Sequence, residues 1–313
     1  MCTEINYDKD TIMQKPFPVI RKTGAVSPYG EATPFVHNGR IYRLELADTS
    51  RGTDPQADSY AIIRDRETGR IISRFANGCY FHSLYEEGGT VYVTGVVSEA
   101  ESKYGSRIRL FESRDLQSWT ERDIISNPGW LYFNTSLTKG PDGYVLCIEA
   151  GAPREYVGEH PFTCFFATSK DLYNWTLMDY DKCFSKDRYM GGPWLRYSRG
   201  YYYLISVTEL PCERYTNYIY RTADFSTWEV GLYNPMLMPG NEDRSISPYA
   251  HDLSREFIEV IKTGMITSNS DVDMCEYGDK TLISYIVGNQ HGFYYLAEAE
   301  YDGSIADLLE SYF

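Results

Sequence analysis

Short runs of alternating apolar and polar residues recur along the chain in pairs, and a glycine-containing turn joins the two members of each pair. Five such turns lie at residues 38–39, 88–89, 142–143, 199–200 and 278–279. Alternation with a period of two is typical of strands with one buried face, and a tight glycine turn between two of them predicts a β-hairpin. Further strand-like residues follow every hairpin. The pattern therefore predicts an all-β fold of five antiparallel blades around one channel, a five-bladed β-propeller.

A second repeat supports the same architecture. The motif Ser/Thr-x-Asp-Leu/Phe-x-x-Trp occurs at residues 113–119, 169–175 and 222–228, each time after a strand-like run. Ser, Thr and Asp favour turns that their own side chains close, and the tryptophan that follows can pack across the next strand. The motif indicates repeated blades and carries no information about chemistry.

Helices are expected to be few. Residues 252–262 place apolar side chains at helical spacing, with Ser254 as the N-cap, and residues 305–311 predict a short helix near the C-terminus. No low-complexity linker divides the chain. We therefore expect a single domain over residues 1–313, in which residues 1–30 form an N-terminal extension that packs on the propeller or closes it.

Charge and cysteine content exclude several classes of partner. The formal net charge is −14, which would repel nucleic acid and anionic membranes. Seven cysteines without a Cys-x-x-Cys motif are typical of buried free thiols in a reducing compartment. The N-terminus has neither a basic start nor an apolar stretch of the signal-peptide kind, and no run approaches the roughly 18 apolar residues of a membrane helix. We therefore expect a cytoplasmic protein, and the oligomeric state stays open.

The candidate chemistry lies where strands meet one end of the channel. In each blade the start of the innermost strand and the end of its hairpin partner emerge on the same face. Among these positions are the acids Glu31, Glu45, Glu149, Glu209, Asp271 and Asp273. An unpaired acid is costly to bury, so acids at matching places in several blades indicate a polar channel or a functional site.

Paired carboxyl groups suit the hydrolysis of a glycosidic bond, which needs one proton donor and one base or nucleophile. Glu209 or Glu149 would be the acid, and Asp271 or Asp273 the base. The residues expected to hold the sugar are Glu31, Glu45, His82, Asn134, Trp194, Arg196, Asn289, Gln290 and His291. His82 fits equally well as a structural histidine of the channel. No nucleotide-binding, P-loop or zinc motif occurs, so no cofactor is expected, although channel carboxylates would also suit a Ca²⁺ ion.

These features together resemble the five-bladed propeller glycosidases, the group of arabinanases, xylosidases and invertases. Residues 133–151, 161–175, 269–285 and 288–303 look most similar to a bacterial set of uncharacterised glycosidase-like propellers. The likeness runs from about Pro34 to the C-terminus. It implies a hydrolase whose general acid corresponds most nearly to Glu209.

One position departs from that resemblance. Arabinanase-type enzymes begin the first blade with an Asp-Pro pair whose Asp is the base, whereas this chain has Thr33-Pro34, with Glu31 two residues earlier. Glu31, Glu45 or the two acids of the last blade would have to replace it. The main hypothesis is an exo-acting glycoside hydrolase on a small oligosaccharide or glycoside. The alternatives are a sugar-binding propeller without catalysis and, third, a protein-interaction propeller.

Overall fold

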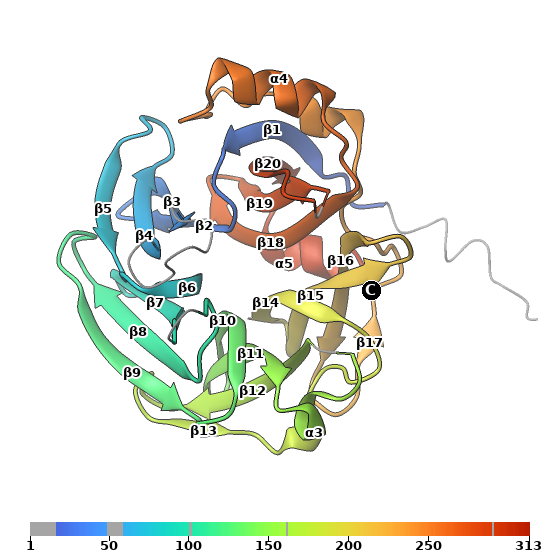
Figure 1. Ribbon diagram of the computed structural model, residues 1–313. Helices are drawn as coiled ribbons and strands as arrows, with labels where there is room; N and C mark the ends of the chain where they lie inside the picture. Colours follow the sequence, from blue (N-terminus) through green and yellow to red (C-terminus); the bar gives the residue numbers. More distant parts are fainter. Residues whose placement is uncertain (1–16, 49–58, 100–101, 161, 290) are drawn as a thin grey trace, which may run out of the picture.

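Five four-stranded antiparallel sheets surround a central channel in the computed structural model (Figure 1). The structure describes residues 17–48, 59–99, 102–160, 162–289 and 291–313. Each sheet is one blade, and the innermost strands of neighbouring blades contact one another around the channel. The predicted five-bladed β-propeller is therefore confirmed.

Each blade has four strands, which follow one another in space from the channel outward. Blade 1 contains β2 (Ala32–His37), β3 (Arg40–Asp48), β4 (Ser59–Asp65) and β5 (Ile71–Phe75). Blade 2 contains β6 (Cys79–Glu87), β7 (Thr90–Val97), β8 (Arg107–Ser113) and β9 (Thr120–Ser126). Blade 3 contains β10 (Leu131–Gly140), β11 (Gly143–Ala152), β12 (Thr163–Ser169) and β13 (Trp175–Leu177). Blade 4 contains β14 (Met190–Ser198), β15 (Tyr201–Leu210), β16 (Arg214–Thr222) and β17 (Glu229–Val230). Blade 5 contains β18 (Ser268–Tyr277), β19 (Lys280–Gly288), β20 (Tyr294–Asp302) and β1 (Arg21–Ser27).

Blade 5 joins the two ends of the chain. Its outermost strand is β1, which pairs antiparallel with β20 from Arg21 opposite Glu300 to Ser27 opposite Leu296. The first strand of the chain thus completes the last blade and closes the ring. Of the N-terminal extension expected over residues 1–30, residues 1–16 lie outside the described part of the chain.

The repeated turn motif acts through its aspartate. Asp115 accepts hydrogen bonds from the backbone N–H groups of Gln117 and Ser118 at 2.8 and 2.7 Å, and the equivalent aspartates of the other two copies bond in the same way. The tryptophan of the first copy, Trp119, stacks on Phe75 of blade 1 with ring centroids 3.7 Å apart. The motif therefore closes a turn and packs one blade on its neighbour.

Helical segments are short and lie outside the sheets. They are α3 (Arg154–Val157), η1 (Tyr180–Lys182), η2 (Asn241–Arg244), α4 (Arg255–Thr263) and α5 (Ile305–Glu310). The two expected from sequence are α4, whose N-cap Ser254 accepts from the Phe257 N–H, and α5. Helix α4 lies on the outer side of blade 5, beyond β1 (Figure 1). In the described residues, no helix has the length and apolar character needed to span a membrane.

The apolar core is divided among the interfaces between blades. Large clusters of buried side chains fill the interfaces between blades 1 and 2, 2 and 3, 3 and 4, and 4 and 5. At the junction of blades 5 and 1, where the ring closes, the described residues form only two clusters of three apolar side chains. The six described cysteines are free thiols, four of them buried. Cys2 lies outside the described residues.

Charged side chains occupy the closing junction instead. Arg43 and Arg64 both donate to Glu45, at 2.9 and 3.0 Å. Arg43 and Arg66 both donate to Glu298 of β20, at 3.2 and 2.8 Å. All five side chains are almost completely removed from solvent. A buried charge is tolerated only when it is paired, so this network needs all its members.

Replacing Glu45 with glutamine is expected to lower the free energy of unfolding by about 3–5 kcal/mol, because two buried guanidinium groups would lose their shared counter-charge. Chemical denaturation followed by circular dichroism measures the change. The matched control is Glu300→Gln, which removes the partly exposed partner of Arg21 and should cost about 1 kcal/mol or less. Equal losses in the two variants would show that the buried network has no special role in closure.

Candidate active site

Breaks in strand register place the residues that line the site. In blades 2 to 5 the pairing between the two innermost strands skips two residues near the start of the innermost strand: after Tyr80, Tyr132, Gly191 and Ser270. Such bulges turn side chains away from the regular alternation of a strand. The skipped residues include His82, Asn134, Gly192, Pro193, Asp271 and Val272, and these six line one small cavity in the channel, together with Glu31, Ala32, Thr135 and Asp273. The bulges therefore build the floor of a funnel.

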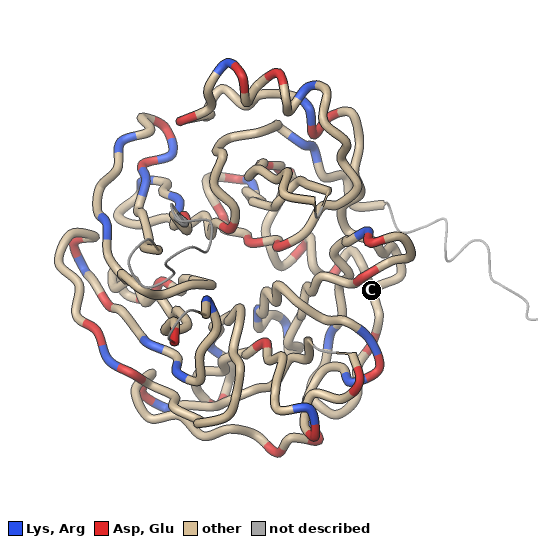
Figure 2. The backbone as a smooth tube through the Cα atoms, in the orientation of Figure 1, with Lys and Arg blue, Asp and Glu red and all other residues tan. Residues whose placement is uncertain are grey.

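Three carboxyl groups line this floor, those of Glu31, Asp271 and Asp273, and a fourth, that of Glu149, is bonded to two residues that line it. Glu31 precedes β2, Glu149 lies on β11, and Asp271 and Asp273 lie on β18. Glu149 Oε2 accepts hydrogen bonds from Asn134 Nδ2 at 3.0 Å and from the Gly192 N–H at 2.9 Å. Asp273 accepts from the Thr33 hydroxyl at 2.7 Å, whereas Glu31 Oε2 is buried without a partner. Figure 2 shows acidic residues on the segments that border the channel.

Two consecutive glycines make room for the acids. A Cβ atom on Gly191 would lie 3.1 Å from Glu149 Oε1, and one on Gly192 would lie 2.3 Å from Asp271 Oδ1. Gly192 also has φ +50°, a conformation that suits glycine. Asp271 itself has a positive φ of 48°, uncommon for a residue with a side chain. The absence of side chains at Gly191 and Gly192 therefore leaves space for the carboxyl groups of Glu149 and Asp271.

Burial alters the acidity of all four groups. It raises the pKa of Glu149 to about 8 and that of Asp273 to about 7, and hydrogen bonds from Asn134 and Thr33 respectively oppose the rise. Burial, reinforced by Asp271, raises the pKa of Glu31 well above its ordinary value. For Asp271 burial alone raises the pKa, and a hydrogen bond from Ser270 opposes it. Burial is therefore the main cause of the raised pKa in all four groups, and the charge of Asp271 adds to it for the other three.

His82 completes the floor as a neutral side chain. Burial lowers its pKa to about 3, and neither ring nitrogen has a hydrogen-bond partner. Gly95 leaves space for the ring, because a Cβ there would lie 2.8 Å from it. In the described part of the chain, no three His, Cys, Asp or Glu side chains are arranged to hold a metal ion.

Above the floor the channel opens into a cavity of about 550 Å³. Glu31 and Asp271 line both spaces. The walls of the wider cavity include Tyr29, Tyr80, Phe81, Lys103, Phe293 and Tyr294. Aromatic faces with a few converging polar groups are typical of sites for small polar ligands.

Three residues predicted to serve the site lie apart from this floor. Glu209 is exposed at the end of β15, opposite Tyr215. Glu45 belongs to the buried ion network at the closing junction. Trp194 is only 4% exposed and packs in the core between blades 4 and 5. None of the three lines the funnel floor or the wider cavity.

The remaining predicted residues lie at two other places. Arg196 lies deeper in the channel, in a separate cavity that also contains Asp273. Asn289 and His291 belong to the loop after β19, where Asn289 accepts from the His291 N–H and His291 pairs with Glu213 at 3.5 Å. Gln290 lies outside the described residues. The sequence analysis missed the Gly191–Gly192 pair, whose signal is two adjacent glycines at the start of an innermost strand.

Solved structures of known proteins share the fold of this chain. No protein-family model and no curated protein sequence matches the chain. Among solved structures, BT0996 in its RGII complex superposes with a TM-score of 0.64 at 14% identity, covering 93% of this protein and 94% of BT0996. A thermostable family-43 glycoside hydrolase gives 0.61 at 11% identity over 91% and 93% of the two proteins. The α-L-arabinanase of Cellvibrio cellulosa, complexed with arabinohexaose, gives 0.52 at 10% identity over 92% and 98%.

These likenesses extend over nearly the whole chain. The protein has the five-bladed β-propeller of the glycoside hydrolases that include arabinanases, xylosidases and fructofuranosidases. At 10–14% identity the likeness concerns the fold, and the chemistry has to be argued from the residues on the funnel floor.

Proposed function

We propose that the protein is a glycoside hydrolase that removes a terminal sugar from a small oligosaccharide or glycoside in the funnel. The observation that carries this proposal is the group of four buried carboxyls with divided roles. Glu149, with a pKa of about 8, is a proton donor at neutral pH. We assign the ionised role to Asp271, whose charge adds to the effect of burial in raising the pKa of the other three acids. A protonated acid beside an ionised one is the pair that glycoside hydrolysis requires.

The geometry supports these roles for Glu149 as the acid and Asp271 as the ionised group. Glu149 and Asp271 lie against the adjacent residues Gly191 and Gly192, so the two carboxyls are close neighbours; Asp271 lines the floor, and Glu149 is bonded to floor residues. Asn134 and the Gly192 N–H hold Glu149 in place. Glu149 would protonate the leaving oxygen, and Asp271 would act on the anomeric carbon, directly or through a water molecule.

The shape of the funnel favours an exo mode of action. A cavity of about 550 Å³ lies above a floor space of only about 20 Å³, and Glu31 and Asp271 line both. A chain end can reach the acids through such a taper, whereas the middle of a long polysaccharide cannot. Burial at the floor also excludes bulk water, which strengthens electrostatic interactions with the transition state.

Incubation with a panel of oligosaccharides and aryl glycosides tests the proposal, with products read by mass spectrometry. Arabino-oligosaccharides and fragments of RGII belong in the panel, because similar structures are described in complex with such carbohydrates. The wild-type protein should release a monosaccharide, and Asp271→Asn should reduce the rate at least about 100-fold. Release that is equally fast in Asp271→Asn would remove Asp271 from the mechanism.

The second candidate function is carbohydrate binding without catalysis. Its support is Thr33, which stands where the arabinanase-type enzymes have their basic Asp and here only donates a hydrogen bond to Asp273. This function predicts no product with any member of the panel, together with thermal stabilisation by one of the same sugars.

A further inference from the structure

A second cavity lies deeper in the channel than the funnel floor. Its volume is about 330 Å³, and later residues of all five innermost strands, with Ile305 and Ala306 of α5, form its wall. Asp273 is the one residue that lines both this cavity and the floor above it. The cavity therefore opens toward the opposite end of the channel and is separate from the proposed catalytic site. We call it the far cavity.

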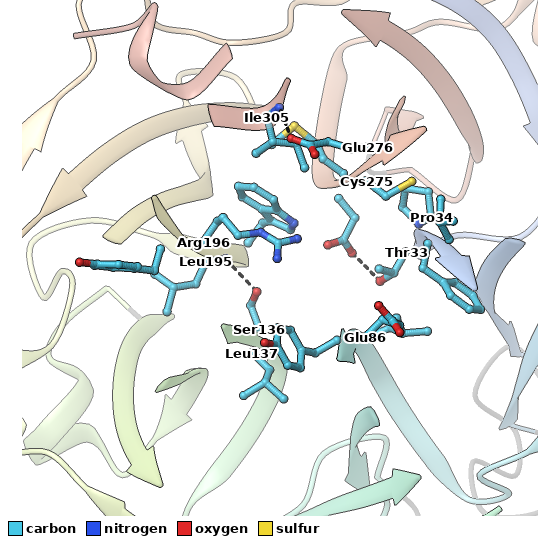
Figure 3. A pocket seen from close by; sticks show the side chains of 18 of the residues that line it. Thr33, Pro34, Glu86, Ser136, Leu137, Leu195, Arg196, Cys275, Glu276 and Ile305 are labelled. Atoms are coloured by element: carbon cyan, nitrogen blue, oxygen red, sulfur yellow. Dashed lines mark hydrogen bonds between the residues drawn. The ribbon is translucent and has the colours of Figure 1, made fainter. Parts of the chain in front are cut away.

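Arg196 is the cation of the far cavity. Its guanidinium points toward the middle of the space, with Thr33 on the opposite wall (Figure 3). The guanidinium lies over the Trp194 ring at 5.4 Å, and its Nε atom is buried without a hydrogen-bond partner. Among the described residues none forms an ion pair with Arg196; Asp273, which bonds to Thr33, and Glu276 act on it only through their charge. A partly buried guanidinium without a counter-ion costs free energy, and it suits a ligand carboxylate, which can bind it through two parallel hydrogen bonds.

The other charged groups of the wall are carboxyl groups, and hydroxyl groups accompany them. Glu86 and Glu276 lie at the mouth, where they accept the backbone N–H groups of Gly89 and Ile305 and keep further carboxylate oxygens free. Ser136 accepts from the Leu195 N–H, which leaves its hydroxyl proton to donate. A dianion such as phosphate would meet Glu86, Glu276 and Asp273 as like charges. A monoanion that also carries hydroxyl groups satisfies both the guanidinium and the acceptors.

We propose that the far cavity is a binding site for a small sugar acid, whose carboxylate pairs with Arg196 and whose hydroxyls bond to Glu86 and Glu276. The volume of about 330 Å³ is close to the lower limit for small-molecule sites, which matches a monosaccharide. The site does not depend on hydrolysis in the funnel. A sugar acid bound here would lie next to Asp273, on the other side of the catalytic carboxyls.

Isothermal titration calorimetry with D-galacturonate and D-glucuronate tests the proposal, with D-galactose and D-glucose as neutral counterparts. One of the two uronates should bind at least about tenfold more tightly than its neutral counterpart. Arg196→Gln should weaken uronate binding by about tenfold or more. The matched control is Arg199→Gln on the same hairpin, which removes an exposed arginine paired with Asp307 and should bind like the wild type.

A second variant tests the same site in case Arg196→Gln does not fold. Ala306→Phe adds a ring at the mouth of the far cavity without touching Arg196 and should also abolish uronate binding, while circular dichroism reports the fold. Asp271→Asn should leave uronate binding unchanged, which separates this site from the funnel. Unchanged uronate affinity in both Arg196→Gln and Ala306→Phe would overturn the proposal. Inorganic phosphate binding as tightly as the uronate would overturn it too, by showing a general anion site.

Discussion

Glu149→Gln is expected to lower kcat for the released sugar by about 10²–10⁴-fold and to leave the fold intact. Glutamine keeps the shape of the side chain and can still accept from Asn134 and the Gly192 N–H, but it has no proton to give to a leaving oxygen. Steady-state kinetics on the substrate found in the oligosaccharide panel measure the loss. Glycosides with an activated leaving group should recover part of the rate, because they need less help from an acid.

The control for this experiment is Glu209→Gln, which changes the exposed acid at the end of β15. It should change kcat by less than about threefold, because the Glu209 side chain is exposed, whereas that of Glu149 is buried and bonded to residues of the floor. The pH profile adds a second readout. With a pKa of about 8 for Glu149, wild-type kcat should fall as the pH rises above 8. A large loss in Glu209→Gln with full activity in Glu149→Gln would reverse the assignment of the acid.

The same group makes stability depend on pH. Burial raises the pKa of Glu149 in the folded protein above that of the unfolded chain, so between about pH 4.5 and 8 the folded state binds a proton that the unfolded state has released. Its contribution to stability is complete below the unfolded pKa and is lost as the pH rises through 8. Denaturation at pH 5 and pH 9 should therefore show a smaller difference in Glu149→Gln than in the wild type.

Gly192→Ala is expected to reduce activity by about 100-fold or more, the second large effect. The new methyl group would lie 2.3 Å from Asp271 Oδ1 and 3.0 Å from Val207 Cγ2, so the Asp271 carboxyl would have to leave its position beside residue 192. Kinetics should show the loss in kcat, because the methyl group displaces a reacting group. The positive φ adds a stability cost of about 1–2 kcal/mol.

Gly200→Ala separates these two effects. Gly200 lies in the turn of the same blade with φ +91°, and a Cβ there would have no atom within 4 Å. This variant should show the stability cost of the backbone conformation with nearly full activity. If both variants retained activity, the close approach of Gly192 to Asp271 would have no catalytic significance.

The number of blades and the order of their hairpins along the chain could be predicted from the sequence, because both depend on local sequence signals. A hairpin needs only its own turn residues and alternation, and the Asp115-type turn closes through bonds to residues two and three positions on. Such signals need no knowledge of distant contacts, and the structure reproduces them.

The positions of the acids depend on less local features. Glu45 and Glu149 both interrupt the second strand of a blade, but Glu149 lies six residues after Gly143 and Glu45 five after Arg40, where the two strands begin. Because side chains alternate, this single-residue difference directs Glu149 toward Gly192 of the next blade and Glu45 toward the junction with the previous blade, where Arg43 bonds both Glu45 and Glu298. Register bulges decide likewise where His82 and Asp271 point. Bulges follow from the pairing of two strands, which a single run of residues does not specify.

The pairing of β1 with β20 fixes the order in which the molecule can become complete. The hydrogen bond between Arg21 and Glu300 spans 279 positions, so a chain emerging from the ribosome holds β1 without its partner strand until β20 has been made. Blade 5 can acquire its fourth strand, and the buried charges of blade 1 their partner Glu298, only after synthesis reaches residues 294–302. The ring can thus close only after β20 has emerged, and a nascent chain stalled before β20 would expose both β1 and the arginines of blade 1 to chaperones and proteases.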